Sequence, residues 1–133
     1  MQWNNKFIYP KSTRSIVQGS RHYSVNDELL PSVTTILKAT ESEEKKAKLA
    51  EWKNRVGHKQ AEIISREATS RGSSMHDYLE KFLLGKLNMD LLGDNTREKM
   101  MADQIIENGL RNKLSEIWGC EATLYYPGKY AGA

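Results

Sequence analysis

The chain has 133 residues, of which 38% are hydrophobic and 28% charged, with a formal net charge of +3 at pH 7. This length allows one compact domain and is too short for two ordinary ones. The single cysteine, Cys120, excludes an internal disulfide and a cysteine-based zinc site, and it is typical of a reducing compartment. No segment approaches the roughly 18 consecutive apolar residues that cross a bilayer, and the N-terminus lacks the apolar core of a signal peptide. We therefore expect a cytoplasmic protein with no membrane partner and no disulfide-linked partner.

The positive charge is concentrated in the first half of the chain. Residues 1–70 contain 12 Lys and Arg against 8 Asp and Glu, whereas residues 71–133 contain 8 against 9. This asymmetry permits a polyanionic partner without requiring one, because nucleic-acid binders usually gather their basic residues on one face.

The first structured element that the sequence predicts is a short β-hairpin. A polar stretch over residues 11–19 is expected to be a loop. Apolar and polar residues then alternate over 22–25, an Asn-Asp pair at 26–27 has turn chemistry, and two leucines follow before Pro31.

Helices are predicted next along the chain. Ser32 stands where an N-cap belongs, ahead of a short helix over residues 33–38. Strong helix formers with acids first predict a helix over residues 43–56, and helical spacing of apolar residues resumes after Gly57 as far as Thr69. The stretch "TSRGSS" (69–74) is expected to interrupt the helix that follows Gly57.

The second half is predicted to contain two more helices and two strands. One helix begins near Met75 and stops at Gly85, residues 87–95 form a loop, and a long helix covers 96–118, with Ile106, Leu110, Leu114 and Ile117 facing inward. A strand over 120–126, a turn at 127–128 and a returning strand from Tyr130 complete the pattern. Because this last strand is left without its partner, the sequence predicts that residues 1–133 are one domain truncated before its core is complete.

His76 lies at the border of an apolar helical face that contains Met75, Tyr78, Leu79, Phe82 and Leu83. Gly72, His76 and Glu80 form one row at i, i+4 and i+8, and a glycine in that row lets a backbone or a ligand approach. Two interpretations are open. His76 is either a half-buried histidine that bonds a backbone carbonyl or a metal ligand.

Glu121 is the possible associate of His76, because it lies in a strand-like run that otherwise looks half buried. A carboxylate on an inner strand is costly unless it is paired or bound to a cation. The alternative is that Glu121 points outward as a solvated strand residue. An imidazole from a helix and carboxylates from strands would suit Mg²⁺ or Mn²⁺ acting on phosphate esters.

Four blocks of sequence, in this order, resemble a known family. They are "LPSVTTIL" (30–37), "EWKNRVG" (51–57), "SRGSSMHDYLE" (70–80) and "EATLYYPGKYAGA" (121–133). Together they are similar to the RecB-like branch of the PD-(D/E)XK nucleases, and most of all to the phage exonucleases and the mitochondrial genome maintenance exonuclease family. The resemblance covers roughly residues 21 to 133.

The resemblance implies a fold and an activity. The fold would be α+β, mostly helical in this segment, with an N-terminal helical region and the start of a restriction-endonuclease-like mixed sheet. His76 matches the family's helix histidine beside the metal site, and Glu121 matches the acid on the first core strand. The family's metal-binding Asp and its D/E-x-K strand would lie beyond Ala133, so residues 1–133 are expected to lack most of the catalytic centre.

Five further residues are candidates for binding substrate. Ser32, Thr34 and Thr35 would donate to phosphates from the first helical turn, although capping their own helix is the alternative. Lys53 would lie on a basic edge, with a solvated helix face as the alternative, and Arg71 stands beside the presumed metal site. We therefore expect a Mg²⁺- or Mn²⁺-dependent exonuclease on single-stranded or end-exposed DNA, or alternatively a nucleic-acid-binding module without chemistry.

Overall fold

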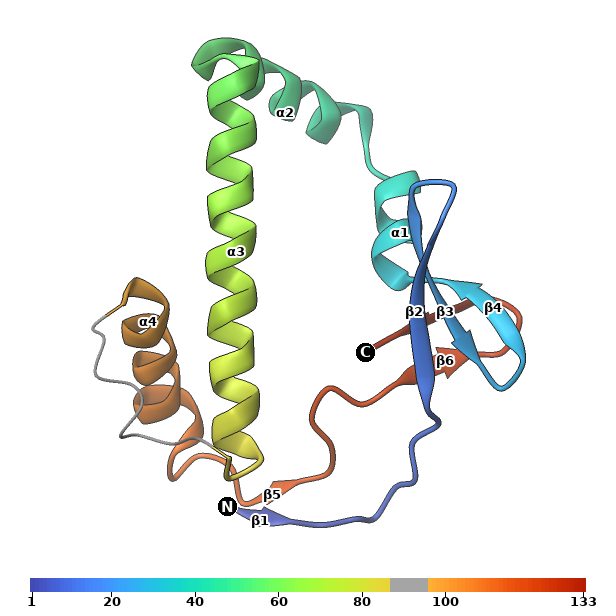
Figure 1. Cartoon of the computed structure of the whole chain (residues 1–133), viewed down its shortest axis with the longest axis vertical. Helices are drawn as coiled ribbons and strands as arrows, with labels where there is room; N and C mark the ends of the chain where they lie inside the picture. Colours follow the sequence, from blue (N-terminus) through green and yellow to red (C-terminus); the bar gives the residue numbers. More distant parts are fainter. Residues whose placement is uncertain (87–95) are drawn as a thin grey trace. The chain divides into compact units, whose positions relative to one another are not determined.

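The computed structural model describes residues 1–86 and 96–133 (Figure 1). The chain divides into two compact units. Unit 1 comprises Met1–Asn5 and Trp52–Cys120, and unit 2 comprises Lys6–Glu51 and Glu121–Ala133. Helices and small sheets occur together, so the α+β class is confirmed. Among the described residues, no helix combines the length and apolar character that a membrane crossing requires.

Unit 2 contains a three-stranded antiparallel sheet of β2 (Ser12–Val17), β3 (Ser20–Val25) and β4 (Glu28–Pro31). Both connecting turns have two residues with positive φ, 50° and 78° at Gln18 and Gly19, and 48° and 66° at Asn26 and Asp27. Such turns match the twist of paired strands. The predicted hairpin is confirmed. The predicted loop over 11–19 is wrong, because β2 pairs along its whole length with β3.

A second hairpin of β6 (Leu124–Tyr126) and β7 (Tyr130–Gly132) belongs to the same unit. The predicted turn and returning strand are present, but the strand expected over 120–126 begins only at Leu124. Ala131 is fully buried and forms a core cluster with Tyr23, Val25 and Leu30. A parallel bridge between Ser32 and Ala131 joins this hairpin to the entrance of α1 (Val33–Ala39).

Helices α1 and α2 (Glu43–Val56) begin where their sequences predict. The Ser32 hydroxyl accepts a hydrogen bond from the backbone N–H of Thr35 and caps α1. The bounds of α2 agree with the prediction at both ends, and α2 begins in unit 2 and ends in unit 1.

Helix α3 (His58–Leu83) runs through 26 residues without a break, so the predicted interruption at 69–74 is wrong. Serine, arginine and glycine lower helix propensity by at most about 1 kcal/mol each, and no proline is present to remove a backbone donor. The predicted stop is confirmed. Gly85 has a φ of 68°, and the N–H groups of Gly85 and Lys86 donate to the carbonyls of Phe82 and Lys81.

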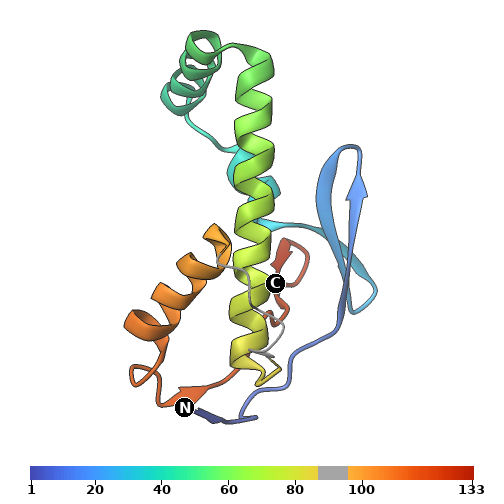
Figure 2. The ribbon, with the colours of Figure 1, turned by 60° about the vertical axis from the view of Figure 1, so that its left-hand side comes forward.

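Helix α4 (Arg97–Ile105) packs along the C-terminal part of α3 in unit 1 (Figure 2). Its cap is Thr96, and a π-helical turn, η2 (Ile106–Leu110), ends the helix well before the predicted Trp118. The shared core contains Tyr78, Ala102 and Ile106, with Leu110 packed against it. The predicted loop over 87–95 lies outside the described residues.

The residues after η2 form a strand instead of a helix. β5 (Glu116–Ile117) pairs in parallel with β1 (Gln2–Trp3), which buries Ile117 and leaves Leu114 exposed. Trp118 Nε1 donates to the Glu116 carboxylate at 2.8 Å, and Asn4 Nδ2 donates to it at 3.3 Å. These bonds favour the charged carboxylate and lower the pKa of Glu116.

Candidate nucleic-acid interface

His76 lies on α3 in unit 1 and is exposed, so the prediction of a half-buried side chain is wrong. The packed side of the helix is the one that carries Tyr78, which meets α4. Gly72, one turn earlier, is partly exposed, and a Cβ atom built on it would meet no atom within 4 Å. The residues that the structure describes therefore leave open space at Gly72.

Glu121 also differs from its predicted environment. It is exposed, lies in a bend before β6, and has a positive φ of 51°. The buried polar residue of this segment is Thr123, whose hydroxyl shares a hydrogen bond of 2.7 Å with the Ser12 hydroxyl. The inner-strand position expected for Glu121 is therefore wrong. The alternative is right that Glu121 is exposed to solvent, but the residue lies outside the strand β6.

No three His, Cys, Asp or Glu side chains come together within residues 1–86 and 96–133 in a way that would hold a metal ion. His76 belongs to unit 1 and Glu121 to unit 2, and the two units are described separately. Their convergence on one metal therefore stays a prediction. Lys53 on α2 and Arg71 on α3 are both partly exposed members of unit 1, and their contact with phosphate also stays a prediction.

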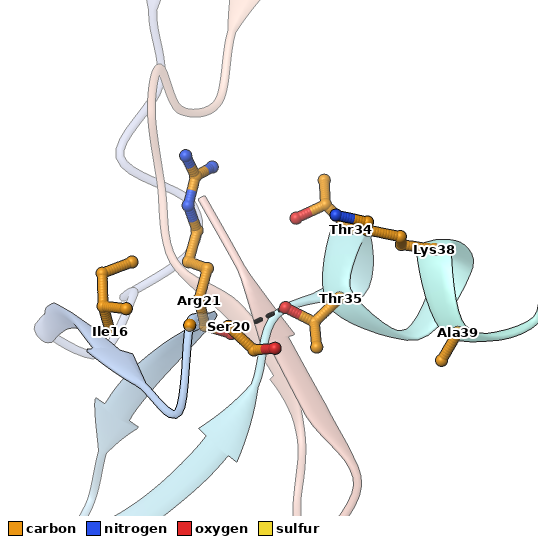
Figure 3. A pocket seen from close by; sticks show the side chains of 8 residues that line it. Ile16, Ser20, Arg21, Thr34, Thr35, Lys38 and Ala39 are labelled. Atoms are coloured by element: carbon orange, nitrogen blue, oxygen red, sulfur yellow. Dashed lines mark hydrogen bonds between the residues drawn. The ribbon is translucent and has the colours of Figure 1, made fainter. Parts of the chain in front are cut away.

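Unit 2 contains a groove between β3 and α1 with a volume of about 630 Å³. We call it the cationic groove. One wall carries Arg21, from the start of β3, and the other carries Thr34, Thr35 and Lys38 from α1 (Figure 3). The Arg21 and Lys38 side chains are exposed, and no Asp or Glu is among the described residues that line the groove. The local charge of the groove is therefore positive.

The two walls of the cationic groove are joined through the backbone of Arg21. Its carbonyl oxygen accepts a hydrogen bond from the Ser32 N–H at 3.0 Å. It accepts a second from the Thr35 hydroxyl at 2.9 Å, which Figure 3 shows as a dashed line. Ser32 itself is only 2% exposed. The two bonds hold the base of the Arg21 side chain in place relative to α1.

The hydroxyl groups of Ser32, Thr34 and Thr35 form a connected chain. The Ser32 oxygen lies 2.7 Å from the Thr34 hydroxyl and 2.9 Å from the Thr35 hydroxyl, and it accepts from the Thr35 N–H at 3.1 Å. Since the Thr35 hydroxyl donates to the Arg21 carbonyl, its oxygen accepts from Ser32, and Ser32 in turn accepts from Thr34. All three hydroxyl hydrogens are then used inside the protein.

This hydrogen-bond chain offers the three hydroxyls partners inside the protein, and their donation to phosphate stays a prediction. Ser32 caps α1, as the alternative proposed, and its hydroxyl is buried. Thr34 and Thr35 do line the cationic groove, but when these bonds are made the donors left for an anion are those of Arg21 and Lys38. Guanidinium and ammonium groups are the usual phosphate ligands of proteins.

Sequence reasoning did not identify Arg21 and Lys38. Lys38 follows Thr34 by four residues, which places both on one helical face, and this spacing is a usable signal. Arg21 has no such signal, because it reaches the groove only through the hydrogen bonds between β3 and α1.

Comparison with known protein families, with curated proteins and with solved structures finds no match to this chain.

Proposed function

We propose that this chain binds the phosphate backbone of DNA in the cationic groove, as part of a metal-dependent DNA exonuclease. The binding proposal rests on one observation. Arg21 and Lys38 lie on opposite walls of the same groove, and no Asp or Glu is among the described residues that line it. Two cations on opposite walls suit a chain of phosphodiesters, since the attraction needs no base recognition. The alternative function is a nucleic-acid-binding module without chemistry.

The nuclease part of the proposal rests on the resemblance to the RecB-like PD-(D/E)XK enzymes. In this proposal residues 1–133 are the N-terminal part of a restriction-endonuclease-like domain that acts on single-stranded or end-exposed DNA. His76 and Glu121 alone do not make up a site for Mg²⁺ or Mn²⁺, which takes several oxygen ligands. Among the described residues no further His, Cys, Asp or Glu completes a metal site with them, so in this proposal other residues supply the remaining ligands.

The binding proposal is tested by the salt dependence of DNA affinity. A fluorescein-labelled thymidine oligonucleotide is titrated with wild type, Arg21→Ala and Lys38→Ala over a range of salt concentrations, with EDTA present to prevent cleavage. Each variant should bind more weakly and should lower the slope of log K against log salt by about 0.7, as expected for one lost phosphate contact on a single strand.

Lys45→Ala is the matched control, because it removes the same charge from an exposed helical position outside the groove. It should change affinity and slope much less than Lys38→Ala. Equal effects of the two lysine variants, or an unchanged slope for Arg21→Ala, would contradict the groove as the binding site.

The two candidate functions differ in divalent-dependent cleavage. The protein that carries these residues together with any native sequence downstream should degrade labelled DNA in Mg²⁺ or Mn²⁺ if it is a nuclease. DNA binding without cleavage would favour the binding module.

A further inference from the structure

Unit 2 has a second groove, of about 440 Å³, whose lining includes Val33, Leu124, Tyr126 and Tyr130. Leu124 is 65% exposed, Tyr126 56% and Tyr130 41%, so these three large side chains form an open apolar surface, which we call the tyrosine platform. The rings of Tyr126 and Tyr130 stack with centroids 5.8 Å apart and an interplanar angle of 28°.

Strand geometry explains why the tyrosines are exposed. In the β6–β7 hairpin, Tyr126 pairs with Tyr130 and Tyr125 pairs with Ala131. Successive side chains point to opposite faces, so the Tyr125–Ala131 pair packs on the core, while the Tyr126–Tyr130 pair lies on the open face. Within the described residues, burial of one face of this hairpin therefore leaves the rings of Tyr126 and Tyr130 exposed on the other face.

Helix α1 contributes to both grooves of unit 2. Val33 lines the groove of the tyrosine platform, and Thr34, Thr35 and Lys38 line the cationic groove. No Asp or Glu is among the described residues that line either groove, and the Glu28 carboxylate accepts a hydrogen bond from the Gly128 N–H at the β6–β7 turn. An aromatic surface and a cationic surface thus adjoin one short helix.

We infer that the tyrosine platform is a base-stacking site for single-stranded nucleic acid whose phosphates bind Arg21 and Lys38. The inference rests on the proposed function of the cationic groove and adds to it a second binding surface, which contacts the bases. Single-strand binders combine a positive groove for the backbone with aromatic side chains on which bases stack. Bases in a duplex are already stacked and paired, so the platform should favour single strands over duplexes, with little sequence preference.

The experiment compares a thymidine oligonucleotide with an abasic oligonucleotide of the same length, which keeps the phosphates and lacks the bases. Wild type should bind the thymidine oligonucleotide about 5-fold or more tightly than the abasic one, since stacking contributes on that order per base. Tyr126→Leu and Tyr130→Leu should reduce the affinity for thymidine to the abasic level. Tyr126→Phe keeps the ring and should bind as wild type does.

The outcomes separate this inference from the binding proposal. If wild type binds both oligonucleotides equally, or if the leucine variants bind thymidine as wild type does, the stacking site is overturned while the groove stands. If Arg21→Ala and Lys38→Ala leave both affinities unchanged, the groove itself fails.

Crosslinking of wild type to a 5-bromouracil oligonucleotide avoids variants that fail to fold. Mass spectrometry should locate the crosslink at Tyr126 or Tyr130, and crosslinks that exclude both residues would overturn the inference. Sedimentation should show the same monomer mass for wild type and Tyr126→Leu. A dimer that only wild type forms would instead make the platform a self-association surface.

Discussion

At the scale of single residues, the cationic groove shows that an exposed position and an available donor are different properties. Thr34 is exposed, yet its hydroxyl hydrogen is used by the buried Ser32. Arg21 and Lys38 have no such constraint on their side-chain donors, because a guanidinium carries five N–H groups and an ammonium three. In the proposed function, the hydroxyls organise the groove and the two cations contact the anion.

His76 provides the residue-scale prediction for the nuclease proposal. The His76 side chain is exposed on α3, so His76→Ala should leave the melting temperature unchanged. In the protein that cleaves DNA, the His76→Ala substitution should lower the cleavage rate about 10- to 100-fold, as expected for loss of a group in a metal's ligand shell. Cleavage rate, DNA affinity in Ca²⁺ and melting temperature are measured together.

Leu79→Ala is the control for His76→Ala. Leu79 packs against the core between α3 and α4, so its truncation should cost about 2 kcal/mol of stability and leave the rate per folded molecule unchanged. A wild-type cleavage rate in His76→Ala would show that the histidine is only a surface residue.

At the scale of secondary-structure elements, glycine has opposite effects on stability in α3 and in the β2–β3 turn. Gly72 has helical backbone geometry inside α3, and Gly19 has a φ of 78° in the turn. A Cβ on either residue meets nothing within 4 Å, so backbone conformation alone decides the effect of a side chain. Alanine suits the first conformation and is strained in the second.

Gly72→Ala should therefore stabilise the protein by about 0.5 to 1 kcal/mol, because alanine loses less backbone entropy in a helix. Gly19→Ala should destabilise it by about 1 kcal/mol, since a left-handed conformation disfavours a side chain. Urea unfolding of both variants measures the two signs. If Gly72→Ala is destabilised, a neighbouring part of the protein occupies the space beside Gly72. If the variant is more stable but cleaves DNA more slowly, a ligand occupies that space.

At the scale of the whole molecule, the proposed metal donors and the proposed DNA-binding groups are distributed over two units. His76 belongs to unit 1, whereas Glu121, the cationic groove and the tyrosine platform belong to unit 2. Binding of a polyanion needs only unit 2 in the proposal. Hydrolysis needs a set of metal ligands that no three described side chains of this chain supply.

The whole-molecule prediction is that purified residues 1–133 bind single-stranded DNA and do not cleave it in Mg²⁺ or Mn²⁺. One histidine and one glutamate are too few ligands for the two metals that such hydrolysis uses. A gel assay with labelled oligonucleotide measures cleavage, and anisotropy in EDTA measures binding. Divalent-stimulated cleavage that copurifies with the chain and disappears in His76→Ala would contradict the prediction.

The sequence by itself determined the features that local hydrogen bonding controls. The cap at Ser32, both ends of α2, the turn at 26–27 and the stop at Gly85 all depend on residues within a few positions of one another. These features were therefore predicted correctly.

Only the tertiary structure decided the features that depend on a partner in another secondary-structure element. β2 is a strand because it pairs with β3, and the helix after Thr96 ends early as β5 pairs with β1 more than a hundred residues away. Arg21 and Lys38 line one groove because the Arg21 carbonyl bonds to Ser32 and Thr35. Such contacts follow from which surfaces meet on folding, and neither hydrophobic periodicity nor capping chemistry carries that information.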